Sequence, residues 1–297
     1  MNFLDKSANV YSQSGEDGIV EAILSSFPSR DRWCVEFGAW DGIYLSNTRR
    51  LIEREGYKAV LIEADSKLYP TLVNNSKAYP GVVCISAFVG FDERTALDVL
   101  LNPTDCPLDF DFLSVDIDGN DIHVWRAITK YRPKLVCIEF NPTIPEGVLF
   151  EQPADPAKKW GSSLDSLIGV ANEKSYVLVC ANSANAFFVA SEVWEKVSNH
   201  QERRSTTRVQ AVKPVQLFVG YDGTIFTTAD IPLVWHGMAA GSNMIQVLPR
   251  YLRRFPSDYN PLQKLAFRIW SEVAKASGTG QPVLVALARK AKRLLLS

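Results

Sequence analysis

VEFGAWDG at residues 35–42 and LIEAD at residues 61–65 are two runs in which strand-forming residues lead directly into a turn or an acid. In doubly wound folds the first such turn lets the backbone approach a ligand, and an acid ending the second strand accepts both ribose hydroxyls. Glu63 follows Gly42 by 21 residues, close to the usual ~20. Because the bulky Trp40 separates Gly38 from Gly42, a pyrophosphate cradle is not expected, and a nucleoside ligand without phosphates fits better.

Around these runs the chain alternates short β-branched segments with amphipathic segments at helical spacing, which predicts a parallel sheet flanked by helices. Only residues 182–185 separate the last two predicted strands, too few for a parallel crossover, so these strands must form an antiparallel hairpin. Seven strands with the last one antiparallel are the arrangement of the Rossmann-like class I S-adenosylmethionine (SAM) methyltransferase sheet, an α/β fold. The predicted strands are residues 33–37, 59–63, 82–87, 112–116, 135–140, 176–181 and 186–189.

The pattern predicts three regions along the chain. Residues 1–30 form a leading helical segment, and residues 31–190 form the SAM-binding methyltransferase domain. Residues 191–297 form a C-terminal extension for acceptor binding or oligomerisation. It contains a predicted hairpin, VQLFVG and TIFTT joined through residues 221–223. Two predicted helices follow, marked by Leu262, Leu265, Ile269 and Val273, and by Val283, Leu287, Ala291 and Leu294.

The composition is that of an ordinary globular protein, with 46% hydrophobic and 22% charged residues. The net charge of -1 argues against general nucleic-acid binding. No secretory signal and no apolar stretch of ~18 residues is visible, so we expect a cytoplasmic protein without a transmembrane segment. The five cysteines lack CxxC spacing and indicate reduced core residues. Residues 289–296 form a predicted basic amphipathic helix, with Arg250, Arg253 and Arg254 upstream. It either attracts an anionic surface, the inner face of a membrane or a charged glycolipid, or packs on its own domain or on a second subunit.

Six blocks resemble, in order and spacing, the FkbM-type branch of class I methyltransferases over residues 11–190. Members of this family commonly O-methylate sugars or glycoconjugates. The blocks are YSQSGEDGIVEAIL, VEFGAWDG, LIEAD, ISAFVG, FLSVDIDGND and VCIEFNP.

This resemblance implies SAM as the cofactor and assigns residues to its parts. Glu36, Gly38 and Asp41 would hold the methionine part, and Glu63 would hold the ribose. The turn departs from many relatives, which have a small residue and Asn where this chain has Trp40 and Asp41. Ala87 and Phe88 would border the adenine, while Gln13 and Glu16 either contact the cofactor or cap the leading helix.

Acids also end the fourth and fifth predicted strands, at Asp116 and Glu139. Neighbouring parallel strands bring such residues together at the carboxyl edge of the sheet, where carboxylates repel one another unless a cation lies among them. The cluster resembles the aspartate-rich site of metal-dependent sugar O-methyltransferases. This resemblance implies Mg²⁺ or Mn²⁺, with Asp116, Glu139 and Asn141 as metal ligands. The alternative is that Asp118 and Asp121 simply cap the next helix.

Methyl transfer needs an in-line nucleophile and removal of its proton. The candidate catalytic residues are Asp116, His123 and His236, although a lone histidine is more often structural. The sequence therefore predicts an O-methyltransferase for a carbohydrate or glycolipid hydroxyl, with or without a divalent metal. Two alternatives stay open, a catalytically silent glycan-binding or scaffold domain and a methyltransferase for a small-molecule or peptide amine.

Overall fold

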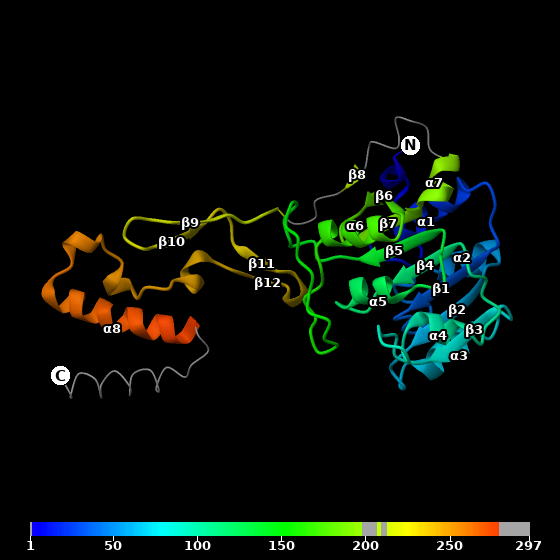
Figure 1. The fold of residues 1–297 in the computed structure, drawn as a ribbon, viewed down its shortest axis with the longest axis horizontal. Helices are drawn as coiled ribbons and strands as arrows, with labels where there is room; N and C mark the ends of the chain where they lie inside the picture. Colours follow the sequence, from blue (N-terminus) through cyan, green and yellow to red (C-terminus); the bar gives the residue numbers. More distant parts are fainter. Residues whose placement is uncertain (1, 198–206, 209–212, 279–297) are drawn as a thin grey trace. The chain divides into compact units, whose positions relative to one another are not determined.

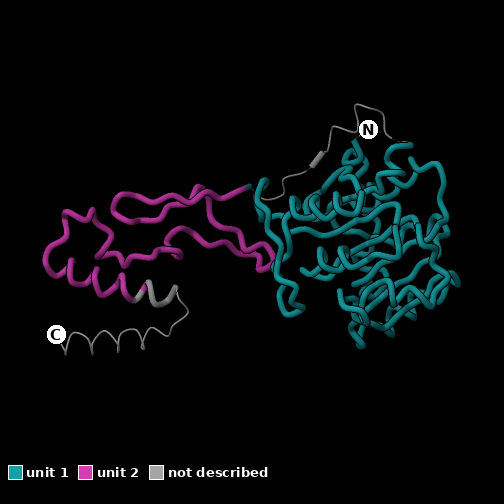
Figure 2. The backbone as a smooth tube through the Cα atoms, in the orientation of Figure 1, with its two compact units in different colours: residues 1–213 teal, residues 214–297 magenta. Residues whose placement is uncertain are grey.

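The chain forms two compact units, residues 1–213 and 214–297 (Figure 2). The computed structural model describes residues 2–197, 207–208 and 213–278. The predicted helix over residues 283–294 and the basic run at 289–296 lie outside the described residues. The first unit extends beyond residue 190, because α7 (Ser191–Val197) and β8 (Thr207–Arg208) belong to it (Figure 1).

The first unit is built on one sheet with the strand order β3-β2-β1-β4-β5-β7-β6-β8. Strand β7 is antiparallel to both β5 and β6, and the five strands from β3 to β5 are parallel. All seven predicted strands and the reversed last strand are confirmed, and β8 adds a short parallel strand beside β6. The seven strands are β1 (Trp33–Phe37), β2 (Lys58–Glu63), β3 (Val82–Ser86), β4 (Phe112–Val115), β5 (Leu135–Glu139), β6 (Tyr176–Ala181) and β7 (Asn185–Ala190).

Helices cover both faces of this sheet, so its strands are buried on two sides. One buried cluster joins the sheet to the short helix η1 (Phe3–Lys6) and to α1, α2, α3 and α7, and a second joins it to α4, α5 and α6. With both faces filled, the carboxyl ends of the parallel strands are the edge at which a ligand can bind. The remaining helices of this unit are α1 (Glu16–Ser25), α2 (Arg49–Glu55), α3 (Tyr69–Ser76), α4 (Leu97–Leu101), α5 (Asp121–Ala127) and α6 (Leu164–Glu173).

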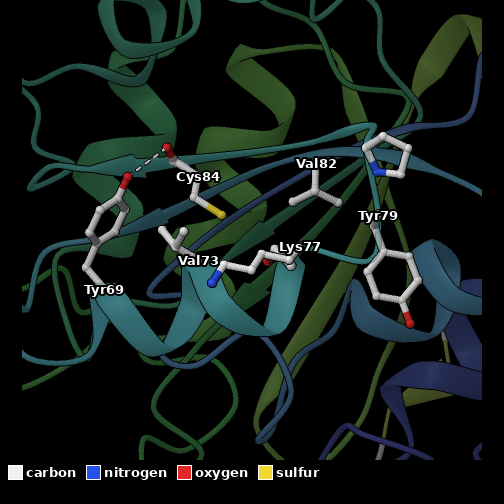
Figure 3. A pocket seen from close by; sticks show the side chains of 8 residues that line it. Tyr69, Val73, Lys77, Tyr79, Val82 and Cys84 are labelled. Atoms are coloured by element: carbon white, nitrogen blue, oxygen red, sulfur yellow. Dashed lines mark hydrogen bonds between the residues drawn. The ribbon is translucent and has the colours of Figure 1, made fainter.

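Strand β3 lies at the edge of the sheet and is partly protected there. The Tyr69 hydroxyl donates to the Cys84 carbonyl at 3.1 Å, and the Val82 amide donates to the Tyr79 carbonyl at 3.0 Å. These bonds satisfy outward backbone groups that a further strand would need. An open cavity of about 320 Å³ lies between α3 and β3 (Figure 3), and none of the candidate site residues lines it.

Over residues 214–278, the second unit contains two hairpins and one long helix. Strands β9 (Leu217–Val219) and β10 (Ile225–Thr227) pair around the predicted turn, and β11 (Ile231–Leu233) pairs with β12 (Met238–Ala240). Helix α8 (Pro261–Gly278) confirms the helix predicted around Leu265. The described part of the unit also has four short 3-10 helices: η3 (Val234–His236), η4 (Ser242–Ile245), η5 (Arg250–Leu252) and η6 (Pro256–Asp258).

All five cysteines are free, as the sequence predicts. Among the described helices, none combines the length and the apolar character needed to cross a membrane.

Candidate active site

The turn after β1 needs a glycine at position 38. Gly38 has φ +72°, and a Cβ atom on it would lie 2.1 Å from the backbone oxygen of Asp116. Any other residue would therefore collide with the end of β4, in addition to adopting a conformation that L-residues disfavour. Gly38 itself is exposed. The turn thus offers open backbone to a ligand at the carboxyl edge.

Glu63 connects the turns that follow β1 and β2. Its side chain is buried, and its two carboxylate oxygens accept hydrogen bonds from the backbone amides of Trp40 and Asp65, both at 2.7 Å. Each oxygen keeps a second lone pair that a ribose hydroxyl could use. The structure places Glu63 beside the glycine turn, as the spacing predicts, and its contact with a cofactor stays a prediction.

Glu36 is occupied within the protein. Its buried carboxylate accepts from the Ser46 hydroxyl at 2.6 Å, from the Asn47 amide at 2.7 Å and from the Thr48 hydroxyl at 2.7 Å. Burial raises the pKa of Glu36, and these three hydrogen bonds oppose that shift. In the structure Glu36 therefore fixes the segment leading into α2. A contact with the methionine part of SAM remains untested.

Asp41 also shapes the loop on which it lies. Its Oδ1 atom accepts from the backbone amides of Ile43 at 2.9 Å and Tyr44 at 2.7 Å, which closes the loop after β1. At the end of β3, the Ala87 amide donates to the Glu63 carbonyl at 3.1 Å, and the Phe88 ring is 48% exposed. Ala87 and Phe88 thus follow the strand next to Glu63, where the resemblance places the adenine.

Glu16 brings the leading segment to the same edge. Its side chain is 1% exposed and accepts from the side-chain amides of Asn182 at 2.7 Å and Asn185 at 3.0 Å. Asn185 is the register partner of Glu139 across β7 and β5. The exposed Gln13, three residues before Glu16, therefore lies on a loop held near the end of β5. This clamp is a role that the sequence alone does not reveal for Glu16.

Three carboxylates meet at the ends of β4 and β5. One oxygen from each of Asp116, Asp118 and Glu139 lies within 4.8 Å of the others. Burial, and then the charge of Asp116, raises the pKa of Glu139, and burial followed by the neighbouring acids raises the pKa of Asp116. Asp116 is an exposed residue, yet the surrounding protein atoms still desolvate its carboxylate. The cluster therefore favours a shared proton or a bound cation.

Asn141 makes local hydrogen bonds through both atoms of its amide, and its role as a metal ligand stays a prediction. Its Oδ1 atom accepts from the amide of Thr143 at 2.9 Å and from the hydroxyl of Thr143 at 2.6 Å, while its Nδ2 atom donates to the Trp160 carbonyl at 2.7 Å. Asp118 is the third member of the carboxylate cluster. Asp121 accepts from the amides of Ile117 and Gly119, which closes the turn that precedes α5. These donors lie before the helix, so a capping role for Asp118 and Asp121 stays a prediction.

Lys159 supplies a positive charge to the cluster. Its Nζ atom lies 3.1 Å from Asp118 Oδ2. The buried Gln152 fixes the chain on both sides of Lys159, because its side chain accepts from the amides of Trp160 at 3.0 Å and Gly161 at 2.9 Å and donates to the Lys158 carbonyl at 3.3 Å. We define residues 150–161 as the lysine loop. No periodicity in the sequence signals the role of Lys159 or Gln152.

Glycine is also required where the lysine loop meets the turn after β4. Gly119 has φ +141°, and a Cβ atom there would lie 2.9 Å from Gln152 Oε1 and 3.1 Å from Lys159 Cα. The absence of a side chain at this position lets the two segments approach closely.

The two candidate histidines lie in different surroundings. His123 Nε2 is 2.8 Å from the Gln152 carbonyl oxygen, and its Nδ1 atom is 3.6 Å from Glu151 Oε1. His123 therefore anchors the lysine loop. His236 is an exposed residue of η3 in the second unit, and its catalytic role stays a prediction.

Exposed aromatic side chains extend from the loops at this edge. Trp40 is 50% exposed and Tyr44 is 59% exposed, and their rings meet edge to face with centroids 5.8 Å apart. Phe88 follows β3, and Trp160, which is 50% exposed, lies on the lysine loop. Flat apolar faces next to carboxylates suit a ligand that combines ring faces with hydroxyl or amine groups.

No protein-family model and no curated protein sequence matches the chain. Among solved structures, the N-terminal domain of EvdMO1 with SAH bound is 13% identical, with 61% of this chain and 81% of that chain covered and a TM-score of 0.40. A SAM dependent methyltransferase from Aquifex aeolicus is 10% identical, with 58% and 89% covered and a TM-score of 0.37. The citrinin polyketide synthase CMeT domain is 13% identical, with 59% and 51% covered and a TM-score of 0.40.

These similarities are too low to assign an activity to this chain. The fold class rests instead on the strand order and the reversed β7 strand, which define a class I methyltransferase sheet.

Proposed function

We propose that the first unit binds SAM at the carboxyl ends of β1, β2 and β3 and transfers its methyl group to a hydroxyl of a sugar or glycoconjugate. The observation that carries this proposal is the position of Asp116. Its backbone oxygen lies against Gly38 of the β1 turn, while its carboxylate belongs to the cluster with Asp118 and Glu139. A donor bound at the turn and an acceptor bound at the cluster would therefore be neighbours.

The donor half of the site rests on three features of the chain. The exposed Gly38 leaves backbone accessible, the carboxylate of Glu63 has lone pairs for ribose hydroxyls, and Phe88 offers an exposed ring face for adenine. Bound SAM supplies an electrophilic methyl group on a sulfonium.

The acceptor half rests on the carboxylates and the aromatic side chains. A carboxylate whose pKa is raised by burial can accept the proton of an acceptor hydroxyl near neutral pH. Trp40 and Trp160 offer faces for sugar rings. His123 supports this half by holding the lysine loop, which is a positioning role.

A divalent metal is the finer part of the proposal. Asp116, Asp118 and Glu139 offer oxygen ligands of the kind that Mg²⁺ or Mn²⁺ prefers, and their oxygens converge within 4.8 Å. Lys159 already supplies one positive charge. The metal and Lys159 are therefore alternative means of neutralising the same carboxylates.

A second candidate acceptor is an amine. Carboxylates beside exposed tryptophan and tyrosine faces also recognise a cationic group, through charge and cation–π attraction. In this case methylation needs no metal.

The proposal has two further parts. The protein acts in the cytoplasm, and residues 191–297 bind the acceptor or associate with a second copy of the chain.

The test begins with calorimetry of the full chain with SAM. The protein is then incubated with labelled SAM and a panel of neutral sugars, amino sugars and simple amines, with and without EDTA. We expect label on a sugar hydroxyl. Label only on an amine nitrogen would support the second candidate, and the absence of SAM binding would contradict both.

A further inference from the structure

Many large apolar side chains of the second unit are in contact with solvent. Among its described residues, Leu252 and Tyr259 are the buried hydrophobic side chains, whereas exposed ones occur in both hairpins and along α8. Exposed apolar surface of this extent marks an interaction site. We therefore expect this unit to bind a partner, and the charge and apolar character of its surface indicate the kind of partner.

Helix α8 has two apolar sides, and among the described residues one of them packs against the rest of the unit while the other is exposed. On the inner side, the rings of Phe267 and Tyr259 lie 5.6 Å apart, and Trp270 Nε1 donates to the Val247 carbonyl at 3.1 Å. On the outer side, Leu262, Leu265 and Ile269 are 78%, 56% and 49% exposed. We call these three residues the outer stripe.

The spacing of the outer stripe is that of one continuous helix face. Positions 262, 265 and 269 are three and four residues apart, which places their side chains above one another on α8. The packing of Phe267 and Trp270 does not require this second apolar face. An amphipathic helix with a free apolar face and basic residues is the form that lies in a lipid interface.

Charge distinguishes between the possible occupants. The second unit contains ten Lys and Arg residues and four Asp and Glu residues, a net charge of +6, whereas the first unit contains 22 and 29, a net charge of −7. Pairing the outer stripes of two copies would bring together two units of charge +6, which repel. An anionic surface is attracted to the same unit.

We propose that the outer stripe of α8, together with the basic residues of the second unit, binds an anionic lipid bilayer. Leu262, Leu265 and Ile269 enter the interface, and residues such as Arg250 and Arg254 meet the headgroups. This inference does not depend on the proposed methyl transfer, because it uses only residues of the second unit. It assigns the apolar contact with the membrane to α8, while the charge of the unit comes from six basic residues at positions 250–275 and from four in the basic run at 289–296.

The test is co-sedimentation of the full chain with vesicles. One set contains phosphatidylcholine alone, and the other contains phosphatidylglycerol as a third of the lipid. We expect sedimentation with the anionic vesicles and much less with the neutral ones, weakening as salt is raised. A chain that stays in the supernatant with both sets would overturn the proposal.

Two pairs of substitutions separate the apolar contribution from the charged one. The neutral change Leu262→Gln with Leu265→Gln should weaken vesicle binding at least about tenfold without altering the net charge. Arg250→Gln with Arg254→Gln should weaken it by about fivefold per residue at low salt. Val99→Gln, at a 46% exposed position of α4 in the first unit, is the matched control and should bind like the parent protein.

Light scattering of the parent and of the Leu262→Gln, Leu265→Gln variant completes the test. A dimer that becomes a monomer in the variant would assign the outer stripe to self-association and overturn the lipid proposal. Equal vesicle binding by the parent and by this variant would also overturn it. Monomers in both cases, with binding lost only in the variant, are the expected result.

Discussion

The Nε2 atom of His123 lies 2.8 Å from the carbonyl oxygen of Gln152, so the helix after β4 is tied to the start of the lysine loop. The Gln152 side chain then fixes the backbone on both sides of Lys159. The ion pair between Lys159 and Asp118 thus depends on two buried or half-buried polar groups. Both are positioning residues in the proposed site.

Gln152→Ala should therefore destabilise the fold and disturb the acceptor half of the site. Loss of the buried side chain leaves two amides and one carbonyl without their partner, which costs about 1–3 kcal/mol. Denaturant unfolding measures this loss, and the acceptor Michaelis constant should rise several-fold while SAM affinity stays near the parent value. Gln152→Glu keeps the acceptor for both amides and should cost less. Equal losses in the two variants would contradict this explanation.

Gly38→Ala and Gly56→Ala form a matched pair for the donor turn. Both glycines have positive φ, +72° and +66°, but an added Cβ at Gly56 meets nothing within 4 Å, whereas at Gly38 it would lie 2.1 Å from the Asp116 oxygen. Gly56→Ala should cost only about 1–2 kcal/mol of backbone strain. Gly38→Ala should cost roughly 3 kcal/mol or more and should abolish SAM binding. Thermal unfolding and calorimetry compare the two variants, and similar values would argue against a close approach at Gly38.

Glu63→Ala should weaken SAM binding by roughly 1.5–3 kcal/mol, the range for a hydrogen bond that involves a charged group. Because Glu63 also binds the amides of Trp40 and Asp65, a second variant is needed. Glu63→Gln keeps one acceptor oxygen and should retain more stability while still losing affinity. Calorimetry gives the affinities, and unchanged SAM binding in a folded Glu63→Ala protein would remove the ribose assignment.

Much of the fold could be predicted because the strand residues carry a local signal. The apolar run at 33–37 and the short 182–185 connection are sufficient to place a parallel strand and a reversed hairpin. Position at a strand end also places Asp116 and Glu139 together. The same position does not show that the Asn141 amide is hydrogen-bonded to Thr143 and Trp160.

The lysine loop and α8 were harder to predict for a different reason. The approach of Lys159 to Asp118 depends on Gly119 and Gln152, which are far apart in the chain and carry no shared pattern. Helical periodicity marks Leu262 and Leu265 as apolar but does not show which side of α8 the unit covers. Tertiary contacts determine the position of Lys159 and the side of α8 that is covered, and the local sequence carries no signal for either.

The metal proposal predicts different effects for substitutions at Asp118 and at Asn141. Asp118→Asn should lower Mn²⁺ affinity by about tenfold or more, since Asp118 belongs to the carboxylate cluster. Asn141→Ala should change it little, because its amide oxygen is used by Thr143. Calorimetry with Mn²⁺ tests both variants. EDTA should abolish transfer but leave SAM binding intact, and full activity after exhaustive chelation would leave a protein base as the remaining explanation.

Asp121 predicts how metal-free stability depends on pH. Burial is the largest cause that raises the pKa of Asp121 from 3.8 to about 6, although hydrogen bonds from three backbone amides oppose the shift. Between these values the folded state holds a proton that the unfolded state has lost, so the free energy of unfolding should fall as pH rises through this window. The contribution is on the order of 1–3 kcal/mol.

The Asp121→Asn variant tests this prediction. Its side chain cannot ionise, so the stability of the variant should fall less between about pH 4 and pH 7. Urea unfolding across this range compares the two proteins in the presence of EDTA. Because Asn offers one acceptor oxygen where Asp offers two, the variant should be less stable at the acidic end, and the difference between the proteins should narrow as pH rises. A constant difference at all pH values would show that Asp121 ionises in the folded protein as it does in the unfolded chain.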